Sequence, residues 1–428
     1  MTEVTRIELL PGVYLTAVHT MKFKSSYMGI QLLTPLSEEH AAANALVPMV
    51  LRRGTERCPD MERLSAALDE LYGGSVEPIA RKKGETQCVG FVASFLDDAY
   101  VPDGTLILEQ AAALLGELLL TPARENSRFV SAYVERERAN LVDRIRAQVN
   151  DKRQYAVLRL VQLMCQGEPY GVDRLGSEAS AAAVTNEELW ARYQALLSGA
   201  RVELYFSGSA PLERVESAFR SALAGLKGRT AAPVSVCRNT LGGGEEKPRN
   251  FEDVLDVTQG KLSIGLRTDI KVTDEEYPAL MLFNAVFGGT TTSKLFLNVR
   301  EKLSLCYYAS SQLEKFKGLM LVFSGVEFDK REAAQSEILT QLEKCRRGEI
   351  EPWELEAARR STVNSLKSML DSQGRMEDFR LGLAVGGGDG PEDLAAKLEQ
   401  VTVDQVAAAA RRVRLDSIYF LKGKEKHQ

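Results

Sequence analysis

Two segments of the chain, about half its length apart, follow the same residue pattern. VTNEELWARYQ (184–194) leads through a short turn to VELYFSG (202–208), and VTVDQVAAAAR (401–411) leads to SIYFLKG (417–423). Each copy has a valine, a threonine placed to cap a helix, an amphipathic helix, and a strand that contains Tyr-Phe. Chance similarity between common pieces of structure is the alternative interpretation. An internal duplication predicts two similar units in one chain.

Hydrophobic periodicity predicts matching elements in both halves. Strands are expected at 12–24, 27–34, 76–81, 87–95 and 202–206, and again at 261–266, 307–313, 319–326 and 417–421. Helices are expected at 41–51, 61–72, 106–120, 127–149 and 186–197, and again at 276–287, 293–302, 330–346, 353–370 and 402–413. We therefore predict an internally duplicated α+β fold, in which two similar domains each carry a mainly antiparallel sheet packed by helices.

A polar, glycine-rich stretch separates the two halves. GGGEEKPRN, from Gly242 to Asn250, has neither periodicity nor apolar content, which is typical of a linker. The predicted domains are residues 1–225, a linker region at 226–258, and residues 259–428.

The amino-acid composition and net charge exclude several classes of function. The net charge of −5 argues against a dedicated nucleic-acid binder and against a surface built for anionic lipid. The six cysteines include no C-x-x-C pair, so neither a zinc ribbon nor a thioredoxin-type motif is present. No secretory signal is visible at the N-terminus, and apolar stretches such as Ala41–Leu51 are too short to span a bilayer. We expect a cytoplasmic protein.

Histidine is scarce, and this limits the chemistry available to the chain. His19, His40 and His427 are the three histidines, and none has a second histidine within helical or strand reach. Each is expected to be structural or on the surface. The segment from Gly288 to Lys294 (GGTTTSK) lacks the glycine and hydroxyl of a phosphate-binding loop, and the segment from Val385 to Gly390 is expected to be a turn or a mobile loop.

Motifs in both halves resemble the pitrilysin/insulinase family of zinc peptidases. In the first half, Gly54-Thr55, Pro59, Leu68-Asp69 and Gly73-Gly74 match the family pattern. In the second half, the segment FNAVFGGTTTSKLFLNVREKLSLCYYASS (283–311) is similar to it. The resemblance covers essentially the whole chain and implies the family's duplicated layout, in which such a chain is half of a clamshell.

The resemblance also locates a metal site that this chain lacks. The family binds zinc through an inverted H-x-x-E-H motif on a helix and a later glutamate. Counting from Gly54-Thr55 places Ala45 and Met49 at the histidine positions and Pro48 at the general base. The third ligand position follows the Glu135–Arg138 charge run, itself expected to be a solvated helix face, and is occupied by Arg144. We expect no metal and no cofactor in this chain.

A second family element is retained. Arg300 and Tyr307 keep the seven-residue spacing of a pair that, in the family, is thought to hold the substrate carbonyl at a partner's metal. Ser304 stands between them where the family prefers glycine. The residues alone also allow a surface arginine and a sheet tyrosine with no such role.

The resemblance implies the non-catalytic subunit of a two-subunit zinc peptidase. The zinc would belong to a homologous partner in a heterodimer that processes peptides, and peptide maturation is one possible task. The segments 12–25 and 44–55 further resemble a bacterial subgroup labelled elongation factor P modification-associated, inactive partner. The alternative is a scaffold or peptide-binding protein of the same fold with no role in hydrolysis.

Overall fold

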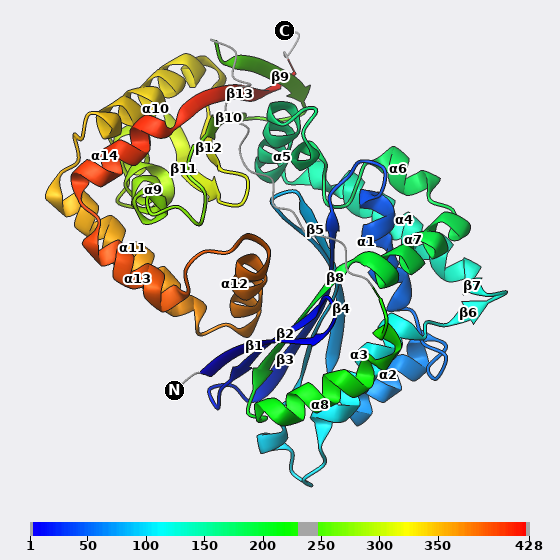
Figure 1. The fold of residues 1–428 in the computed structure, drawn as a ribbon. Helices are drawn as coiled ribbons and strands as arrows, with labels where there is room; N and C mark the ends of the chain where they lie inside the picture. Colours follow the sequence, from blue (N-terminus) through cyan, green and yellow to red (C-terminus); the bar gives the residue numbers. More distant parts are fainter. Residues whose placement is uncertain (1–2, 230–246, 425–428) are drawn as a thin grey trace. The chain divides into compact units, whose positions relative to one another are not determined.

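A computed structural model describes residues 3–229 and 247–424, and its contacts group the chain into two compact units. Unit 1 comprises residues 3–146, 172–229 and 373–385, and unit 2 comprises residues 147–171, 247–372 and 386–424. Each unit contains a sheet with its own helices (Figure 1). None of the described helices is long and apolar enough to cross a membrane. The predicted domain boundaries at 225 and 259 remain a prediction. The two units differ from the predicted domains because residues 147–171 belong to unit 2 and residues 373–385 belong to unit 1.

Unit 1 is built on a six-stranded sheet. Its strands are β1 (Glu3–Leu10), β2 (Val13–His19), β3 (Ser25–Pro35), β4 (Ser75–Lys83), β5 (Thr86–Leu96) and β8 (Arg201–Gly208), with a separate small pair, β6 (Arg124–Glu125) and β7 (Arg128–Phe129). Its helices are α1 (Ala41–Leu51), α2 (Met61–Glu70), α3 (Ile107–Leu120), α4 (Ser131–Ala147), α6 (Glu178–Ala183), α7 (Asn186–Gly199), α8 (Leu212–Ala222) and α12 (Gln373–Gly386), and its short 3₁₀ turns are η1 (Asp98–Tyr100) and η4 (Ala224–Leu226).

Unit 2 is built on a five-stranded sheet. Its strands are β9 (Arg249–Leu255), β10 (Gly260–Arg267), β11 (Cys306–Glu314), β12 (Leu319–Val326) and β13 (Arg414–Gly423). Its helices are α5 (Lys152–Met164), α9 (Tyr277–Asn284), α10 (Arg331–Arg346), α11 (Pro352–Met369), α13 (Pro391–Gln400) and α14 (Val403–Arg412). The shorter turns are η2 (Gln148–Asn150), η3 (Pro169–Gly171) and η7 (Phe328–Lys330), and η5 (Ala285–Gly289) and η6 (Leu295–Lys302) are π-helical.

The two sheets have the same topology, which confirms the internally duplicated α+β fold. Unit 1 has the strand order β1-β2-β8-β3-β5-β4, and unit 2, taken from its β9 edge, has β9-β13-β10-β12-β11. In both, one edge-side pair is parallel, β2 with β8 and β9 with β13, and the remaining pairs are antiparallel. β1 is an additional edge strand in unit 1.

The repeated helix starts are capped in the same way. Thr185 accepts a hydrogen bond from the backbone N–H of Glu188, whose side chain bonds back to the cap residue. Thr402 and Gln405 form the same reciprocal box at α14. Each box satisfies two backbone donors at a helix start that would otherwise lack partners. The same device therefore begins the helix that leads into β8 and the one that leads into β13.

Several elements were not predicted. Residue patterns predicted none of the following elements: β1, α5, α6, α8, α12 and α13. A further strand, β9, lies inside the stretch expected to be a linker. Of the nine-residue linker motif, residues 242–246 lie outside the described residues, whereas Arg249 and Asn250 begin β9. β9 alternates half-buried and exposed residues and pairs in parallel with β13 from the far end of the chain, so no local signal marks it.

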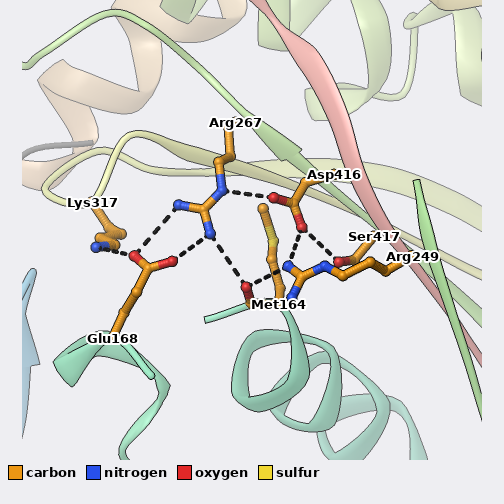
Figure 2. A network of polar contacts seen from close by, with 7 residues as sticks. All are labelled: Met164, Glu168, Arg249, Arg267, Lys317, Asp416 and Ser417. Carbon is orange, nitrogen blue, oxygen red and sulfur yellow. Dashed lines mark hydrogen bonds and ion pairs between the residues drawn. The ribbon is translucent and has the colours of Figure 1, made fainter. Parts of the chain in front are cut away.

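Helix α5 belongs to unit 2 although it follows the N-terminal half in sequence. Its apolar face, with Ala156, Leu160 and Met164, packs on Leu319 and Tyr419 of the sheet. Beyond the helix, charged residues surround its C-terminal end, where the last carbonyl groups lack helical partners. Figure 2 shows this cluster, which contains Met164, Glu168, Arg249, Arg267, Lys317, Asp416 and Ser417.

Two arginines cap this end of α5. Arg249 and Arg267 donate to the Met164 carbonyl oxygen at 2.7 and 3.2 Å (Figure 2). Arg267 also contacts Asp416 at 2.7 Å and Glu168 at 2.5 Å, and the fully buried Lys317 contacts Glu168 at 2.5 Å. The network therefore attaches the helix to the ends of three strands and to the β11–β12 turn.

Helix α12, from the C-terminal half, belongs to unit 1 and packs there through polar contacts. The Gln373 amide donates to the Ser25 carbonyl oxygen at 2.9 Å. Glu377, 1% exposed, pairs with Arg81 at 2.5 Å, and Asp378 pairs with Lys83 at 2.7 Å. A small apolar cluster of Leu33, Cys88, Leu381 and Val385 completes the contact.

Candidate functional site

The first three positions of the family's metal site lie on α1, which is buried along almost its whole length. Ala45 is 1% exposed and Met49 is 7% exposed, and Pro48 lies inside the helix. The helix is apolar because it packs against α7 and β5 within the unit 1 core. An alanine methyl has no donor atom for a metal, and a proline ring cannot take a proton from water.

The fold brings the remaining position to the same place. Arg144, on α4, lies with its Nη1 atom 3.9 Å from the Met49 Sδ atom, although the two residues are far apart in sequence. The four positions therefore meet as the family's pattern requires, but their chemistry does not suit a metal. A guanidinium is always charged and offers only donors, and a lone thioether is a soft ligand that does not suit catalytic zinc. Among the described residues, no group of three potential metal-ligating side chains is present.

Glu137, about two helical turns earlier on α4, is occupied by other contacts. It is 7% exposed and pairs with Arg53, while Asn140 donates to its Oε2 atom at 3.2 Å. The expectation that the charge run is wholly a solvated face is therefore wrong at this position. Its burial is explained by Arg53, which follows α1 directly and reaches α4. Glu135 and Arg136 are exposed, as expected.

Neither described histidine forms part of a cluster. The His19 Nδ1 atom lies 3.3 Å from the Ala210 carbonyl oxygen, and His40 precedes α1 with its Nε2 atom 3.8 Å from Glu39. His427 lies outside the described residues.

The five described cysteines are free and buried, and burial raises the pKa of Cys88 and of Cys345 to about 12. Thiols of this kind are inert as nucleophiles.

The glycine-rich segments are structural. Lys294, at the end of the GGTTTSK segment, is buried and pairs with both Glu354 oxygens at 2.9 and 2.8 Å. It therefore joins η6 to α11 and is not available to bind a phosphate. Gly387 and Gly388 have φ angles of 73° and 106°, which glycine adopts readily, and they form the connection between α12 and α13.

Arg300 lies on η6, within the helix expected at 293–302, and this segment is π-helical. Its side chain is 41% exposed, its guanidinium carbon lies 4.7 Å from the centre of the Phe296 ring, and its Nη1 atom lies 3.5 Å from Glu301. A guanidinium over an aromatic face is weakly held in place. π-helical turns are frequent at functional sites. The arginine therefore places a partly exposed cation on an irregular turn.

The turn between Arg300 and Tyr307 explains the family's glycine preference. Ser304 has a φ angle of 48°, in the left-handed region that side chains disfavour. Its backbone N–H donates to the Arg300 carbonyl at 3.1 Å, and the N–H of Leu305 donates to the Val299 carbonyl at 3.0 Å. These bonds close the end of the helix in the way that glycine-ended helices do.

Tyr307 occupies a β-bulge. On β11, Cys306 pairs with Val326 and Tyr308 pairs with Gly325, so Tyr307 has no partner on β12. The extra residue turns its side chain out of the sheet, where it is 61% exposed. Its hydroxyl donates to the Glu327 Oε1 atom at 2.6 Å, and this bond raises the pKa of Tyr307 above the usual value.

A polar cavity of about 740 Å³ lies beside Tyr307 in unit 2. Tyr307 and Glu327 form one part of its lining, and the segment 256–259, which precedes β10, forms another. Lys152 and Lys261 complete the lining. Tyr307 is predicted from the sequence, but Glu327 and the cavity are not, because both depend on strand pairing.

Comparison with known proteins identifies the family. Residues 183–362 match the family model described as "Peptidase M16 inactive domain". The Bacillus subtilis protein named "Probable inactive metalloprotease YmfF" is 37% identical over 415 residues, which are 97% of this chain and 96% of that protein. The chain belongs to the M16 peptidase family, as an inactive member. The resemblance to the pitrilysin/insulinase peptidases is thereby confirmed.

Other proteins similar to this chain share less of the sequence or only part of it. A Mycobacterium bovis protein named "Uncharacterized zinc protease Mb2805c" is 26% identical over 294 residues, which are 67% of this chain and 66% of that protein. The crystal structure of a conserved protein from Enterococcus faecalis V583 superposes with a TM-score of 0.90 at 27% identity, covering 99% of this chain and 100% of that one. That structure therefore has the same fold over essentially the whole length of this chain.

Proposed function

We propose that this M16 chain is the non-catalytic, substrate-binding subunit of a heterodimeric zinc metallopeptidase that processes peptides. The zinc would be held by a homologous partner subunit. In this arrangement Arg300 and Tyr307 act in trans on the substrate at the partner's metal. The proposal assigns no metal to this chain and predicts no hydrolysis by the chain alone.

The observation that carries the proposal is the contrast between the two halves of the family's machinery. The metal positions hold Ala45, Pro48, Met49 and Arg144, which cannot bind zinc or activate water. Arg300 and Tyr307, by contrast, lie at the two ends of one turn, with Arg300 half-buried and Tyr307 exposed. A side chain that stays largely in contact with water buries little surface, so packing alone gives little reason to keep it in an irregular turn or a bulge. A binding role accounts for their exposure.

The chemistry of the pair fits a developing negative charge. A guanidinium supplies a fixed cation with several N–H donors, and a phenol supplies one O–H donor. Directed at the carbonyl oxygen of a peptide bond under attack, such groups stabilise the oxyanion more than the ground state. The partner's zinc would supply the activated water.

The test is an activity measurement on the assembled enzyme. The chain is coexpressed with a zinc-bearing M16 relative from the same genome, and the purified complex is assayed with the peptide that it cleaves fastest from an internally quenched fluorogenic library. We expect one zinc per heterodimer and none in this chain alone. Tyr307→Phe is expected to lower kcat by about 10²–10³-fold with little change in KM, since loss of one oxyanion donor has effects of that size.

Three further variants sharpen this test. Arg300→Ala is expected to be at least as severe as Tyr307→Phe, and Arg300→Lys to rescue poorly because the planar fork of donors is lost. Tyr100→Phe, at another exposed tyrosine, is the matched control and leaves kcat unchanged. Full activity of both the Tyr307 and the Arg300 variants in intact complexes would favour the alternative, a scaffold of the same fold.

A further inference from the structure

Tyr307 does not have a free hydroxyl group in this structure. Its single O–H hydrogen is donated to the Glu327 carboxylate at 2.6 Å. A phenol carries one hydrogen, so donation to Glu327 and donation to an oxyanion exclude each other. While the bond to Glu327 is made, the phenol offers only lone pairs to a substrate.

The position of Glu327 follows from the bulge. Glu327 comes directly after Val326, the last residue of β12, which pairs with Cys306 at the start of β11. The bulged residue therefore lies next to the end of the neighbouring strand. The hydrogen bond from Tyr307 to Glu327 joins the two strand ends across this position.

A second contact joins the same two segments. The Lys330 ammonium donates to the Ser304 carbonyl oxygen at 3.2 Å. The short segment Glu327–Lys330 thus holds the Ser304–Tyr307 turn at both of its ends. These contacts reach the residue with the left-handed backbone, Ser304, and the bulged residue, Tyr307.

There is also space for the phenol to move. Tyr307 and Glu327 both line the cavity of about 740 Å³, together with Lys152 and Lys261. A side chain that is 61% exposed beside such a cavity can leave its partner without displacing core atoms.

We propose that Glu327 acts as a latch on Tyr307, holding the phenol in a non-donating state until substrate displaces the bond. The inference rests on the proposed function, because it describes how the same Tyr307 is regulated. Glu327 is in this sense a positioning residue that acts through Tyr307. Breaking the latch is part of forming the productive complex.

The first test uses this chain alone and does not depend on any partner. The full chain is labelled with tyrosine carrying ¹³C at Cζ, and each titration is followed by NMR, with the Tyr307 signal assigned by its absence in Tyr307→Phe. Because hydrogen bonding to a carboxylate raises the pKa of a phenol, Glu327→Gln is expected to lower the pKa of Tyr307. The control is Asp329→Asn, which removes the same charge two residues away and leaves the Tyr307 titration in place. An unchanged Tyr307 titration in Glu327→Gln would overturn the latch.

The second test uses the assembled heterodimer and the same fluorogenic peptide. A charge-assisted hydrogen bond is roughly twice as strong as a neutral one, so Glu327→Gln weakens the latch and is expected to raise kcat by about two- to fivefold. Asp329→Asn leaves kcat unchanged. A lowered or unchanged kcat in Glu327→Gln, with Tyr307→Phe still impaired, would overturn the latch and keep the proposed function. Full activity of Tyr307→Phe would instead reject the proposed function, whatever Glu327→Gln does.

Discussion

Helices α5 and α12 occupy equivalent positions in the two halves of the chain, but they are attached to their units in different ways. Each follows a long charged helix, α4 or α11, and each packs in a unit that is otherwise built mainly from the other half. α5 packs through an apolar face and is closed by an ion network at its end. α12 packs through buried polar and charged groups, with one small apolar cluster. In both halves a helix therefore packs in the unit formed mainly by the other half, but the residues that attach the helix differ in their chemistry.

This difference has an energetic consequence. Apolar burial stabilises the folded state in proportion to the apolar surface removed from water, and this contribution does not depend on exact donor and acceptor geometry. Buried ion pairs contribute little net stability, since desolvation offsets most of their attraction, yet breaking one by removing a partner is costly. We therefore expect α5 to be the more firmly held helix, because it adds an apolar face to its ion network, whereas α12 relies mainly on its polar and charged contacts.

The largest effect is expected at Arg267, the centre of the α5 network. Arg267→Met would leave Glu168 and Asp416 each without one ion-pair partner and the Met164 carbonyl without one donor. Removing one member of a buried pair costs about 3–5 kcal/mol. Urea unfolding should show this loss, and hydrogen exchange should place it in α5 and the adjoining strands. Arg347→Met, at an exposed arginine of the same unit, is the control, and equal losses in the two variants would contradict the assignment.

The attachment of α12 is tested at Glu377. Glu377→Gln keeps the shape and removes the charge that faces Arg81, while Asp378 remains as a partner of the arginine. Because burial already favours the uncharged form of this carboxyl and so raises its pKa, we expect Glu377→Gln to keep or slightly raise stability, by up to about 1 kcal/mol. Hydrogen exchange should fall slightly in α12 and stay unchanged in α5. Increased exchange in both helices would show that the charged pair is needed and that the two attachments are not independent.

These attachments illustrate what the sequence could and could not predict. Helix 41–51 and strand 319–326 were predicted with their observed bounds, because each has a strong local pattern. α5 and α12 were not predicted, and amphipathic periodicity does not indicate which sheet a helix will cover. The meeting of Met49 and Arg144 followed from the family resemblance, since the spacing of a motif is retained after its chemistry is lost. The bond from Tyr307 to Glu327 exists only once β11 and β12 pair with a bulge, and no residue pattern encodes it.

The two attachments should respond to pH with opposite signs. Burial raises the pKa of Glu377 above its usual value, more than the Arg81 charge lowers it. Its folded form therefore binds the proton more tightly, and the stability contributed by the protonated group is lost as the pH rises through the folded-state pKa. Burial also opposes ionisation of Asp416 and Glu168, but the hydrogen bonds from their partners outweigh it and lower both pKa values. Their contribution is present at neutral pH and is lost on acidification.

Hydrogen exchange at several pH values, corrected for intrinsic rates, separates the two signs. As the pH falls from neutral towards about 4.5, the usual range of a glutamate, protection of α12 should increase. Below that range, protection at the C-terminal end of α5 should decrease. In Glu377→Gln the first change should disappear and the second should remain. A parallel loss of protection in both helices would contradict the opposite pKa directions.

The smallest effect concerns the turns that lead into the matching edge strands β4 and β11. The first contains Tyr72 at φ 58° and Gly73 at φ 72°, and the second contains Ser304 at φ 48°. Ser304→Gly relieves the strain of a side chain in the left-handed region, but it also frees the unfolded chain, and the two contributions nearly cancel. We expect a gain of about 0.5 kcal/mol, seen as a small rise in Tm. Ser304→Val should lower stability by about 1–2 kcal/mol, because a branched Cβ is least compatible with this φ. If valine is tolerated as well as glycine, the turn is not held in the left-handed form, and the family's glycine preference needs another explanation.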